Sequence, residues 1–552
     1  MNEQERRSHL AGIFGMYTDR RTALKAAAAA GLIPVLGSAT VAARAAAAAQ
    51  DATPVSGGTL VILAQDSIES LSPEDTGETA QWVPITNIFE GLYMVNELYE
   101  LEPVLADSYE PSEDGLTYTF KLKTGVTFHN GDAFTANDVV YTYNWIMDEA
   151  NASTRLANFD LVESVEAPDD TTVVVTLSEA DVTFMVNVAT TFIQPAAYHA
   201  EIGENDFKAA PVGTGAFKFG ELNPQQRVRL DAYEDYYRGR AHLDSFQVDV
   251  VPEAAGRMSA LETGQADNSM WGLNAEDNTT LKESGNFTIY ETQQVATNHF
   301  PLNNTHPFLG EKAVRQALMF GLDRQLFADQ IFLGQAVVAT SNLSPAVAEF
   351  YNPDVAQYTY DPDRAREILD EAGWVEGGDG IREKDGVRAE FTMMVFQGDT
   401  QRRPEAEVAQ QWWLEIGVDC TLQEGVTSEI LGGLREGEYD AGLFNWVYGG
   451  SGGDPDARDT LGTGGANNFF MWSNEEVDQL LNDGIRELDR ETRVGMYKRI
   501  QEIVAEEVPF LFLLNLQTMA FYNKRVKGLP ETVMVTDNVY PKAYQYWIDD
   551  EA

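Results

Sequence analysis

Alternating apolar and polar positions predict strands in several parts of the chain. Every second residue is apolar in 118–123 and in 246–250, which is the period of a strand with one buried face. Residues 59–64 and 510–514 are instead continuously apolar, as is typical of strands covered on both faces. Residues 171–177, which read Thr-Thr-Val-Val-Val-Thr-Leu, are predicted as a further strand.

Apolar positions with helical spacing follow recognisable helix starts. Thr135 with Asp138 three residues later resembles a capping box, and Val139, Tyr143 and Ile146 then lie on one face. Because such helices alternate with strands from about residue 295 onward, the pattern predicts an α/β domain there. Further predicted helix starts are Asp361 followed by Pro362, Ser473 with Glu476, and Asp489.

The length and the charge narrow the possible classes of protein. A chain of 552 residues is too long for one core and predicts two or three domains. A formal net charge of −49 repels phosphates and anionic lipid, so we expect no nucleic-acid partner. Either solubility or adaptation to high salt accounts for this acidity. The single cysteine, Cys420, excludes an intrachain disulfide and is predicted to be a buried strand residue.

The first residues have the pattern of an export signal. Arg20 and Arg21 precede an apolar run at 26–37 and a stretch of small residues at 42–49, which resembles a twin-arginine signal. We therefore predict a signal peptide at 1–49 and a linker at 50–58. The apolar run is too short for a stable membrane span, and no cysteine follows it to carry a lipid anchor. The expected location is periplasmic or extracellular, with export by the twin-arginine route.

Several motifs of enzymes and metal sites match this sequence only superficially. The glycines in 211–219 lack the Gly-Lys-Ser/Thr ending of a phosphate loop, so a turn with positive φ is the better interpretation. Residues 449–453 match Gly-x-Ser-x-Gly, but no histidine follows Ser451, as that hydrolase pattern requires. Asp454, Asp456 and Asp459 have calcium-ligand spacing without the rest of an EF-hand loop. The sequence therefore predicts no catalytic residues, no metal and no cofactor.

Several motifs recur in a fixed order along the chain, among them Glu90 to Tyr93, Val212-Gly-Thr-Gly215 and Asp361 to Trp374. In this order they resemble one known family, the extracellular solute-binding proteins of dipeptide, oligopeptide and nickel ABC importers (solute-binding family 5). The resemblance begins in the stretch from Glu90 to Val140 and covers nearly the whole chain after the export signal. The blocks that carry it are Glu90 to Tyr93, 101–109, Val212-Gly-Thr-Gly215, Tyr233 to Gly239, Val314 to Leu318, Asp361 to Trp374, Ile416 to Val418, Gly453 to Asp456, and Met496 to Pro509.

This resemblance implies an α/β fold of two lobes joined by a hinge, a periplasmic-binding-protein-like clamp with an extra inserted domain. Ligand enters between the lobes and hinge closure buries it. It also implies a monomeric binding protein that delivers its ligand to membrane permease subunits and is not an enzyme. The expected parts are 55–100, 212–294 and 516–552 for lobe one, 101–211 for the inserted domain, and 295–515 for lobe two.

The resemblance leaves the ligand open. Dipeptide-binding relatives hold the ligand's ammonium with an aspartate three residues after the tryptophan that matches Trp446, but position 449 is glycine and the loop is about two residues longer. Asp454 is then the acidic residue expected to bind the amino group of a longer peptide. The relatives' carboxylate-binding arginine lies in a loop that is shorter here, where Arg402 or Arg403 is the substitute.

Both departures favour an oligopeptide over a dipeptide. Aromatic faces with amide neighbours also suit sugar rings, so an oligosaccharide is the alternative ligand. A secreted hydrolase is the alternative from another class. The predicted ligand-binding residues are Trp271, Phe396, Gln397, Arg402, Asn445, Trp446, Tyr448 and Asp454.

Overall fold

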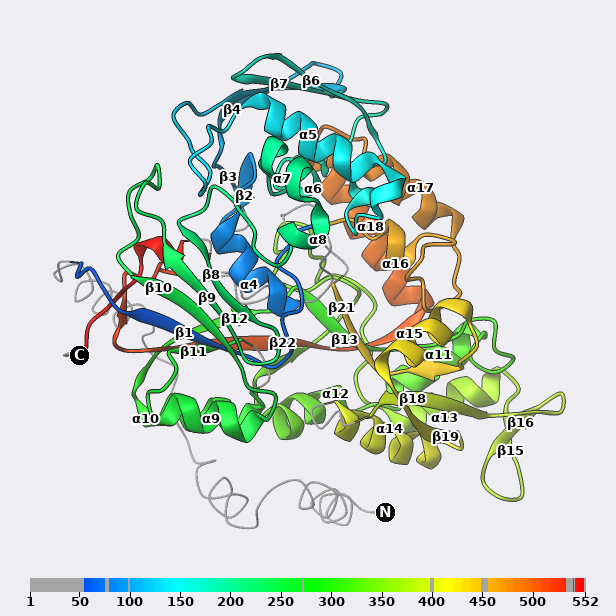
Figure 1. Cartoon of the computed structure of the whole chain (residues 1–552). Coiled ribbons are helices and arrows are strands. Elements are labelled where there is room, and N and C mark those ends of the chain that lie inside the picture. Colours follow the sequence, from blue (N-terminus) through cyan, green and yellow to red (C-terminus); the bar gives the residue numbers. More distant parts are fainter. Residues whose placement is uncertain are drawn as a thin grey trace.

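The computed structural model of the chain describes residues 54–74, 79–97, 100–270, 273–397, 402–447, 455–532, 540 and 542–550. Its strands form three main bodies around separate hydrophobic cores, with short ribbons at the edges (Figure 1).

Sheet A has the strand order β11-β1-β10-β9-β8. The predicted strand at 59–64 is β1 (Thr59–Ala64), which runs parallel to β10 and β11 in the middle of the sheet. Its apolar side chains pack beneath α4 (Thr79–Ile88). The other strands are β8 (Phe217–Asn223), β9 (Arg227–Ala232), β10 (Ser245–Val250) and β11 (Asn268–Ser269), and α9 (Ala254–Glu262) and α10 (Ala275–Ser284) lie nearby.

Sheet B is an antiparallel sheet of order β4-β5-β7-β6 at the top of Figure 1. The predicted alternating strand is β5 (Thr117–Leu122), in which Tyr118, Phe120 and Leu122 are buried. Thr135 and Asp138 form the predicted capping box of α5 (Ala136–Met147), which covers one face. The other elements of this body are β2 (Tyr93–Val95), β3 (Leu101–Pro103), β4 (Ala106–Pro111), β6 (Val162–Asp169), β7 (Thr172–Leu177), η1 (Glu149–Asn151), η2 (Leu156–Phe159), α6 (Phe184–Asn187), α7 (Ala196–Ile202) and α8 (Glu204–Phe207).

The third and largest body contains sheet C, of order β12-β22-β13-β21 with β14 also on β22, and the parallel sheet D, of order β19-β18-β20. Cys420 lies on β19 and is 1% exposed, as predicted. The strands are β12 (Phe287–Gln293), β13 (Ala296–Pro301), β14 (Ala336–Val338), β18 (Glu390–Phe396), β19 (Asp419–Gly425), β20 (Ala441–Gly442), β21 (Phe444–Val447) and β22 (Phe510–Asn523).

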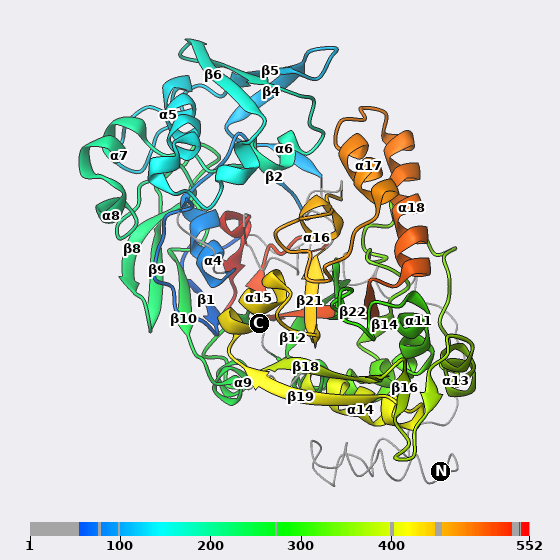
Figure 2. The same cartoon turned by 90° about the vertical axis from the view of Figure 1, so that its right-hand side faces the viewer.

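Helices pack around sheets C and D, as Figure 2 shows. Asp361 and Asp489 cap helices as predicted, but the predicted cap at Ser473 is wrong by one residue. Asn474 is the N-cap, and its side chain accepts from the backbone N–H of Val477. Asparagine caps a helix as well as serine does, so either residue fits the pattern. The helices are α11 (Lys312–Phe320), α12 (Arg324–Leu326), η3 (Phe327–Ile331), α13 (Pro362–Glu371), α14 (Arg403–Glu415), α15 (Thr427–Glu436), α16 (Arg458–Leu461), α17 (Glu475–Gly484) and α18 (Arg490–Glu507).

Strand β22 connects the bodies of sheets A and C. Residues 510–514 are fully buried, as their apolar run predicted, but the strand continues to Asn523. Its first part pairs with β13 and β14, whereas its second part pairs with β12 and packs Ala520 and Tyr522 into the core under sheet A. The expected lobe boundary between residues 515 and 516 therefore falls inside one continuous strand. The remaining elements are the ribbon β15 (Val375–Glu376), β16 (Arg382–Lys384) and β17 (Val387–Arg388), and near the C-terminus β23 (Val526–Lys527), η4 (Ala543–Gln545) and β24 (Trp547–Ile548).

The two glycines of the Val-Gly-Thr-Gly motif are required by a close approach between backbones. A Cβ on Gly213 would lie 2.1 Å from the carbonyl oxygen of Ile88, and one on Gly215 would lie 2.3 Å from that of Asn87. Neither glycine has positive φ, so the predicted turn with positive φ is wrong. The glycines instead allow residues 213–215 to pack directly against the end of α4.

Glu90 fastens the same junction from inside. One carboxylate oxygen accepts hydrogen bonds from the hydroxyls of Tyr236 at 2.8 Å and Tyr237 at 3.1 Å, and the other accepts from Thr214 at 2.9 Å. Burial raises the pKa of Glu90, while these hydroxyls and Arg238 favour its ionised form. We refer to Glu90, Thr214, Tyr236 and Tyr237 as the Glu90 joint. The Glu90 joint brings three motifs that are far apart in the sequence into contact: the one that begins at Glu90, the Val-Gly-Thr-Gly motif and the one that begins at Tyr233.

Candidate functional site

Three of the eight predicted ligand-binding residues, Trp271, Tyr448 and Asp454, lie outside the described residues. The other five lie close to the carboxyl end of β18 and along β21. Phe396 ends β18, Gln397 follows it, and Arg402 immediately precedes α14, while Asn445 and Trp446 are on β21.

Phe396 and Trp446 belong to one continuous group of aromatic rings. Phe444 connects them, with its ring centroid 5.7 Å from that of Phe396 and 5.3 Å from that of Trp446, on which it stacks. Phe469 packs edge-on against Phe444 and Trp446 at 5.6 Å and 5.5 Å. We call these four residues the aromatic cluster. Sequence reasoning missed Phe444, although its alternation with Trp446 on one strand is visible, and missed Phe469, which no local pattern connects to them.

Two arginines border the aromatic cluster. The guanidinium of Arg402 lies 5.2 Å from the ring centroid of Phe396, and that of Arg435 lies 5.8 Å from the ring of Phe469. Such cation–π contacts hold a guanidinium against a ring, and Arg435 also donates two hydrogen bonds to the side-chain oxygen of Asn467. Phe396, Phe444 and Phe469 are buried and Trp446 is half-buried, so the result is an apolar core patch that carries positive charge at its edges.

Arg402 and Arg403 are no longer equivalent candidates once their contacts are known. Nε of Arg403 lies 2.8 Å from a carboxylate oxygen of Glu407, and a second ion pair joins Arg403 to Glu424. Arg403 is therefore bound between two carboxylates of the same protein. Arg402 is the one that lies against the aromatic cluster.

The structure does not bring the predicted amide residues into the aromatic cluster. Successive side chains of a strand point to opposite faces, so Asn445 points away from the face that carries Phe444 and Trp446. Gln397 is exposed, and its backbone N–H donates to the carbonyl of Gly425 at 2.9 Å.

His299 lies directly behind the aromatic cluster. It is fully buried, and its ring packs edge-on against Phe444, Phe470 and Phe510. Burial is the main cause that lowers the pKa of His299 to about 4, so the ring is neutral at physiological pH. The positive charge at this site therefore comes from the arginines.

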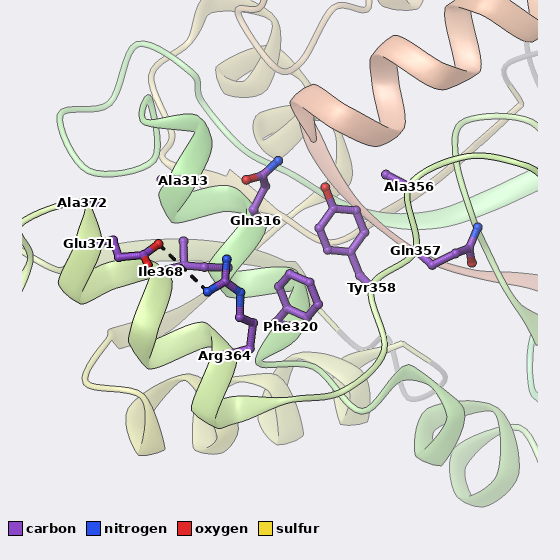
Figure 3. Close-up of a pocket in the computed structure, with 10 residues that line it drawn as sticks. All are labelled: Ala313, Gln316, Phe320, Ala356, Gln357, Tyr358, Arg364, Ile368, Glu371 and Ala372. Carbon is purple, nitrogen blue, oxygen red and sulfur yellow. Dashed lines mark ion pairs between the residues drawn. The ribbon is translucent and has the colours of Figure 1, made fainter.

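A separate recess lies between α11, α13 and the segment 356–358, with a volume of about 480 Å³ (Figure 3). Phe320 and Tyr358 form its apolar wall, and Arg364 lies across from them. The hydroxyl of Tyr358 already donates to the carbonyl of Ala505, and Arg364 is ion-paired with Glu367 and Glu371. None of the predicted ligand-binding residues lines this recess.

The described residues contain no group of three or more His, Cys, Asp or Glu side chains placed to hold a metal ion. Of the three aspartates with calcium-ligand spacing, Asp456 binds Arg458 through both carboxylate oxygens and Asp459 accepts from the side chain of Asn467. Asp454 and the Gly-x-Ser-x-Gly motif lie outside the described residues. Within the described part of the chain, no helix has the length and apolarity needed to cross a membrane.

Comparison with known families decides the class. The family of "Bacterial extracellular solute-binding proteins, family 5 Middle" matches residues 100–469, well over half of the chain. The chain belongs to this family. Family 5 consists of substrate-binding components of ABC transporters that work outside the cytoplasm, and not of enzymes.

Individual relatives match over most of their length. Heme-binding protein A of Haemophilus influenzae is 29% identical over 80% of this chain and 84% of its own. Oligopeptide-binding protein AppA of Bacillus subtilis is 29% identical over 81% and 82%. The structure of AppA in complex with a nonapeptide superposes with a TM-score of 0.77, at 27% identity, over 90% of this chain and all of that one. The expected α/β fold of a two-lobed periplasmic-binding-protein-like clamp is thereby confirmed.

Proposed function

We propose that this family 5 protein captures a peptide, an oligopeptide in preference to a dipeptide, between two lobes and delivers it to the permease of an ABC importer. The observation that carries the proposal is the likeness to AppA in both sequence and fold, and the AppA structure contains a nonapeptide. The aromatic cluster with arginines at its edges fits the same ligand class, because peptides combine apolar side chains with carboxylates. The relatives compared above are named for heme or for peptides, so the oligosaccharide alternative has no support.

Within this proposal sheet A, strand β12 and the end of β22 belong to lobe one, sheet B belongs to the inserted domain, and sheet D with the rest of sheet C belongs to lobe two. The boundaries remain those expected from the sequence: 55–100, 212–294 and 516–552, then 101–211, then 295–515. Segment 1–49 acts as a twin-arginine export signal, and the exported protein works as a monomer. Trp271, Phe396, Arg402, Trp446, Tyr448 and Asp454 are proposed as ligand contacts, with Arg402 holding a peptide carboxylate.

A melting-temperature panel tests the function. Nonapeptides, tripeptides and heme are added separately to the purified protein, because a ligand that binds only the folded state stabilises it by about 2.7 kcal/mol at one hundred times its Kd. We expect nonapeptides to raise the melting temperature by a few degrees and tripeptides to raise it less. A clear shift with heme and none with any peptide would overturn the proposal.

Arg402→Gln and the matched control Arg403→Gln then test the carboxylate contact. We expect Arg402→Gln to weaken peptide binding about tenfold or more, as loss of a charge-assisted hydrogen bond does. Arg403→Gln should change the affinity little, because its guanidinium is engaged by Glu407 and Glu424. Equal effects of the two substitutions on the dissociation constant, measured by calorimetry, would remove Arg402 from the site.

A further inference from the structure

Arg155 is half-buried and differs from the buried arginines Arg257 and Arg324 in the bonds that it makes. Arg257 donates to the carbonyls of residues 251 and 252, and Arg324 donates to three backbone carbonyls. These guanidinium groups serve to satisfy carbonyl oxygens. The half-buried side chain of Arg155, by contrast, donates to no acceptor among the described residues, and its Nε is buried without a partner there, as is that of Arg324.

Trp82 holds the guanidinium of Arg155 in place. The carbon at the centre of that guanidinium lies 4.8 Å from the centroid of the Trp82 ring, and Trp82 itself packs on Phe192 at 6.1 Å. A guanidinium held over an aromatic face keeps its donors at the edge, where a planar carboxylate can accept two of them. The group is therefore oriented to donate to a planar anion, and no side chain among the described residues accepts a hydrogen bond from it.

The carboxylate that interacts electrostatically with Arg155 is Glu74, which does not neutralise it. Glu74 is 1% exposed, and among the described residues its side chain accepts only one hydrogen bond, at 3.3 Å from the hydroxyl of Ser153. Its other carboxylate oxygen has no partner in that part of the chain. Burial raises the pKa of Glu74 to about 7 despite the attraction of Arg155, so near pH 7 it carries only part of a negative charge.

This group lies where the bodies of sheets A and B meet, next to α4. The backbone N–H of Thr154 donates to the carbonyl of Glu74 at 3.0 Å, which fixes the segment before α4 against the loop that carries Arg155. Figures 1 and 2 both place α4, with Trp82 on it, between the strands of sheet A and the helices α15 and α16. In the proposed division of the chain, Arg155 belongs to the inserted domain and its ring partner Trp82 to lobe one, whereas Arg402 belongs to lobe two.

We propose that Arg155, held flat by Trp82, binds a carboxylate of the ligand, so that the protein selects for peptides that present an anionic group to the sheet A side. This inference deepens the proposed function and rests on it for the identity of the ligand. A chain with a net charge of −49 repels anionic ligands at long range, so an anionic ligand needs a local cation, and no described carboxylate accepts a hydrogen bond from the Arg155 side chain. Two sources of the carboxylate are distinguishable, the C-terminus of the peptide and an acidic side chain.

The test uses four versions of one nonapeptide that raises the melting temperature of the wild type. They combine a free or amidated C-terminus with Glu or Gln at one internal position. Each is titrated calorimetrically into the wild type, Arg155→Gln and the control Arg366→Gln, which removes an exposed arginine. We expect Arg155→Gln to weaken binding of one carboxylate-bearing version by about tenfold or more and of its amide counterpart by less than about threefold. If the difference appears between the free and the amidated C-terminus, Arg155 binds the C-terminal carboxylate of the peptide. If it appears between Glu and Gln, Arg155 binds the acidic side chain.

Two further measurements separate this inference from its alternatives. If Arg155 serves only the fold, Arg155→Gln lowers the melting temperature without ligand; if it is a binding group, the variant is as stable as the wild type or more so. A second probe, sodium succinate, is titrated while the Nε–Hε NMR signal of Arg155 is followed, with the signal assigned by its absence in Arg155→Gln.

A succinate-dependent shift of that signal supports the carboxylate site even if every peptide fails, in which case the proposed function alone falls. Peptide binding that is equally strong for acids and amides in wild type and Arg155→Gln overturns the carboxylate site and leaves the proposed function standing. No shift with succinate, together with a lower melting temperature of the variant, also overturns it.

Discussion

Glu74 and Glu90 lie on either side of α4 in the sequence, Glu74 buried and Glu90 half-buried, and the two carboxylates differ in how many hydrogen-bond partners they have. Glu90 accepts three hydroxyl hydrogen bonds, whereas Glu74 accepts one long bond from Ser153 and keeps one oxygen without a partner among the described residues. Burial raises the pKa of both, so desolvation is the shared cost. A carboxylate that serves only the fold is expected to have all its hydrogen-bond donors in place. A carboxylate with too few donors beside a cation is typical of a binding site without its ligand.

The backbone around the two groups repeats this difference. Next to the Glu90 joint, His129 donates to the carbonyl of Gly215 at 2.9 Å and accepts from the N–H of Gly213 at 3.2 Å. Both glycines lie against α4 with no room for a side chain. We therefore expect substitutions at the joint to affect the free energy of unfolding, and substitutions around Glu74 to affect pH dependence and ligand binding.

The largest expected effect is that of Gly213→Ala. The added methyl group would lie 2.1 Å from the carbonyl oxygen of Ile88, and because that oxygen belongs to the backbone, α4 or the motif must move. We expect a loss of more than about 3 kcal/mol in the free energy of unfolding, at the upper end of overpacking effects. Urea unfolding followed by tryptophan fluorescence measures it.

Gly495→Ala is the matched control. Gly495 lies inside α18, and a Cβ there would have no atom within 4 Å. We expect this variant to gain about 0.5 to 1 kcal/mol, since alanine is the better helix former. A Gly213→Ala protein as stable as the wild type would show that the joint is looser than the structure indicates, and would remove one side of the comparison.

The next effect in size is the pH dependence contributed by Glu74. Its pKa rises from 4.5 to about 7 on folding, so the folded state holds the proton more tightly than the unfolded state. Stability is therefore highest below pH 4.5 for this group and falls as the pH rises to about 7, by up to about 3 kcal/mol. Glu74→Gln removes the titration and should be more stable than the wild type at pH 8 and similar to it at pH 4.5.

The measurement is the difference in free energy of unfolding between Glu74→Gln and the wild type at several pH values, which cancels the contributions of other groups. A difference that stays constant from pH 4.5 to 8 would mean that Glu74 has a normal pKa and is paired in solution. The distinction between a satisfied and an unsatisfied carboxylate would then be lost.

Local periodicity predicted much of the fold but little of either carboxylate's surroundings. The alternation in 118–123 and the apolar run in 59–64 identified β5 and β1, because burial of one or both faces leaves its period in the sequence. The reason for Gly213 was not predictable, since the carbonyl that requires it belongs to Ile88, far away in the chain. Arg155 was missed because its ring partner and its carboxylate come from other segments.

The candidate site likewise contains residues that the sequence predicted and residues that only the structure reveals. Phe396, Arg402 and Trp446 were predicted from family motifs, and they lie together in the structure. Phe469 and Arg435 join them through tertiary packing that no spacing encodes. The sequence offered Arg402 or Arg403 for the carboxylate and placed only Arg402 among the predicted ligand-binding residues, whereas the contacts of Arg403 with Glu407 and Glu424 became known only from the structure.

The smallest expected effect compares single hydroxyls at the two carboxylates. Tyr236→Phe keeps the ring, which packs edge-on against Tyr237 at 5.0 Å, and removes the 2.8 Å hydrogen bond to Glu90. We expect it to lose about 2 kcal/mol in the free energy of unfolding, because an enclosed carboxyl oxygen loses a hydrogen-bond donor that nothing replaces. Ser153→Ala removes the 3.3 Å bond to Glu74 and should lose less than about 1 kcal/mol, because a long bond contributes little. Both are measured by urea unfolding at pH 8, where Glu74 is ionised and its single donor has its greatest value. If Ser153→Ala costs as much as Tyr236→Phe, Glu74 depends on its surroundings as strongly as Glu90 does, and its lack of partners is no sign of a missing ligand.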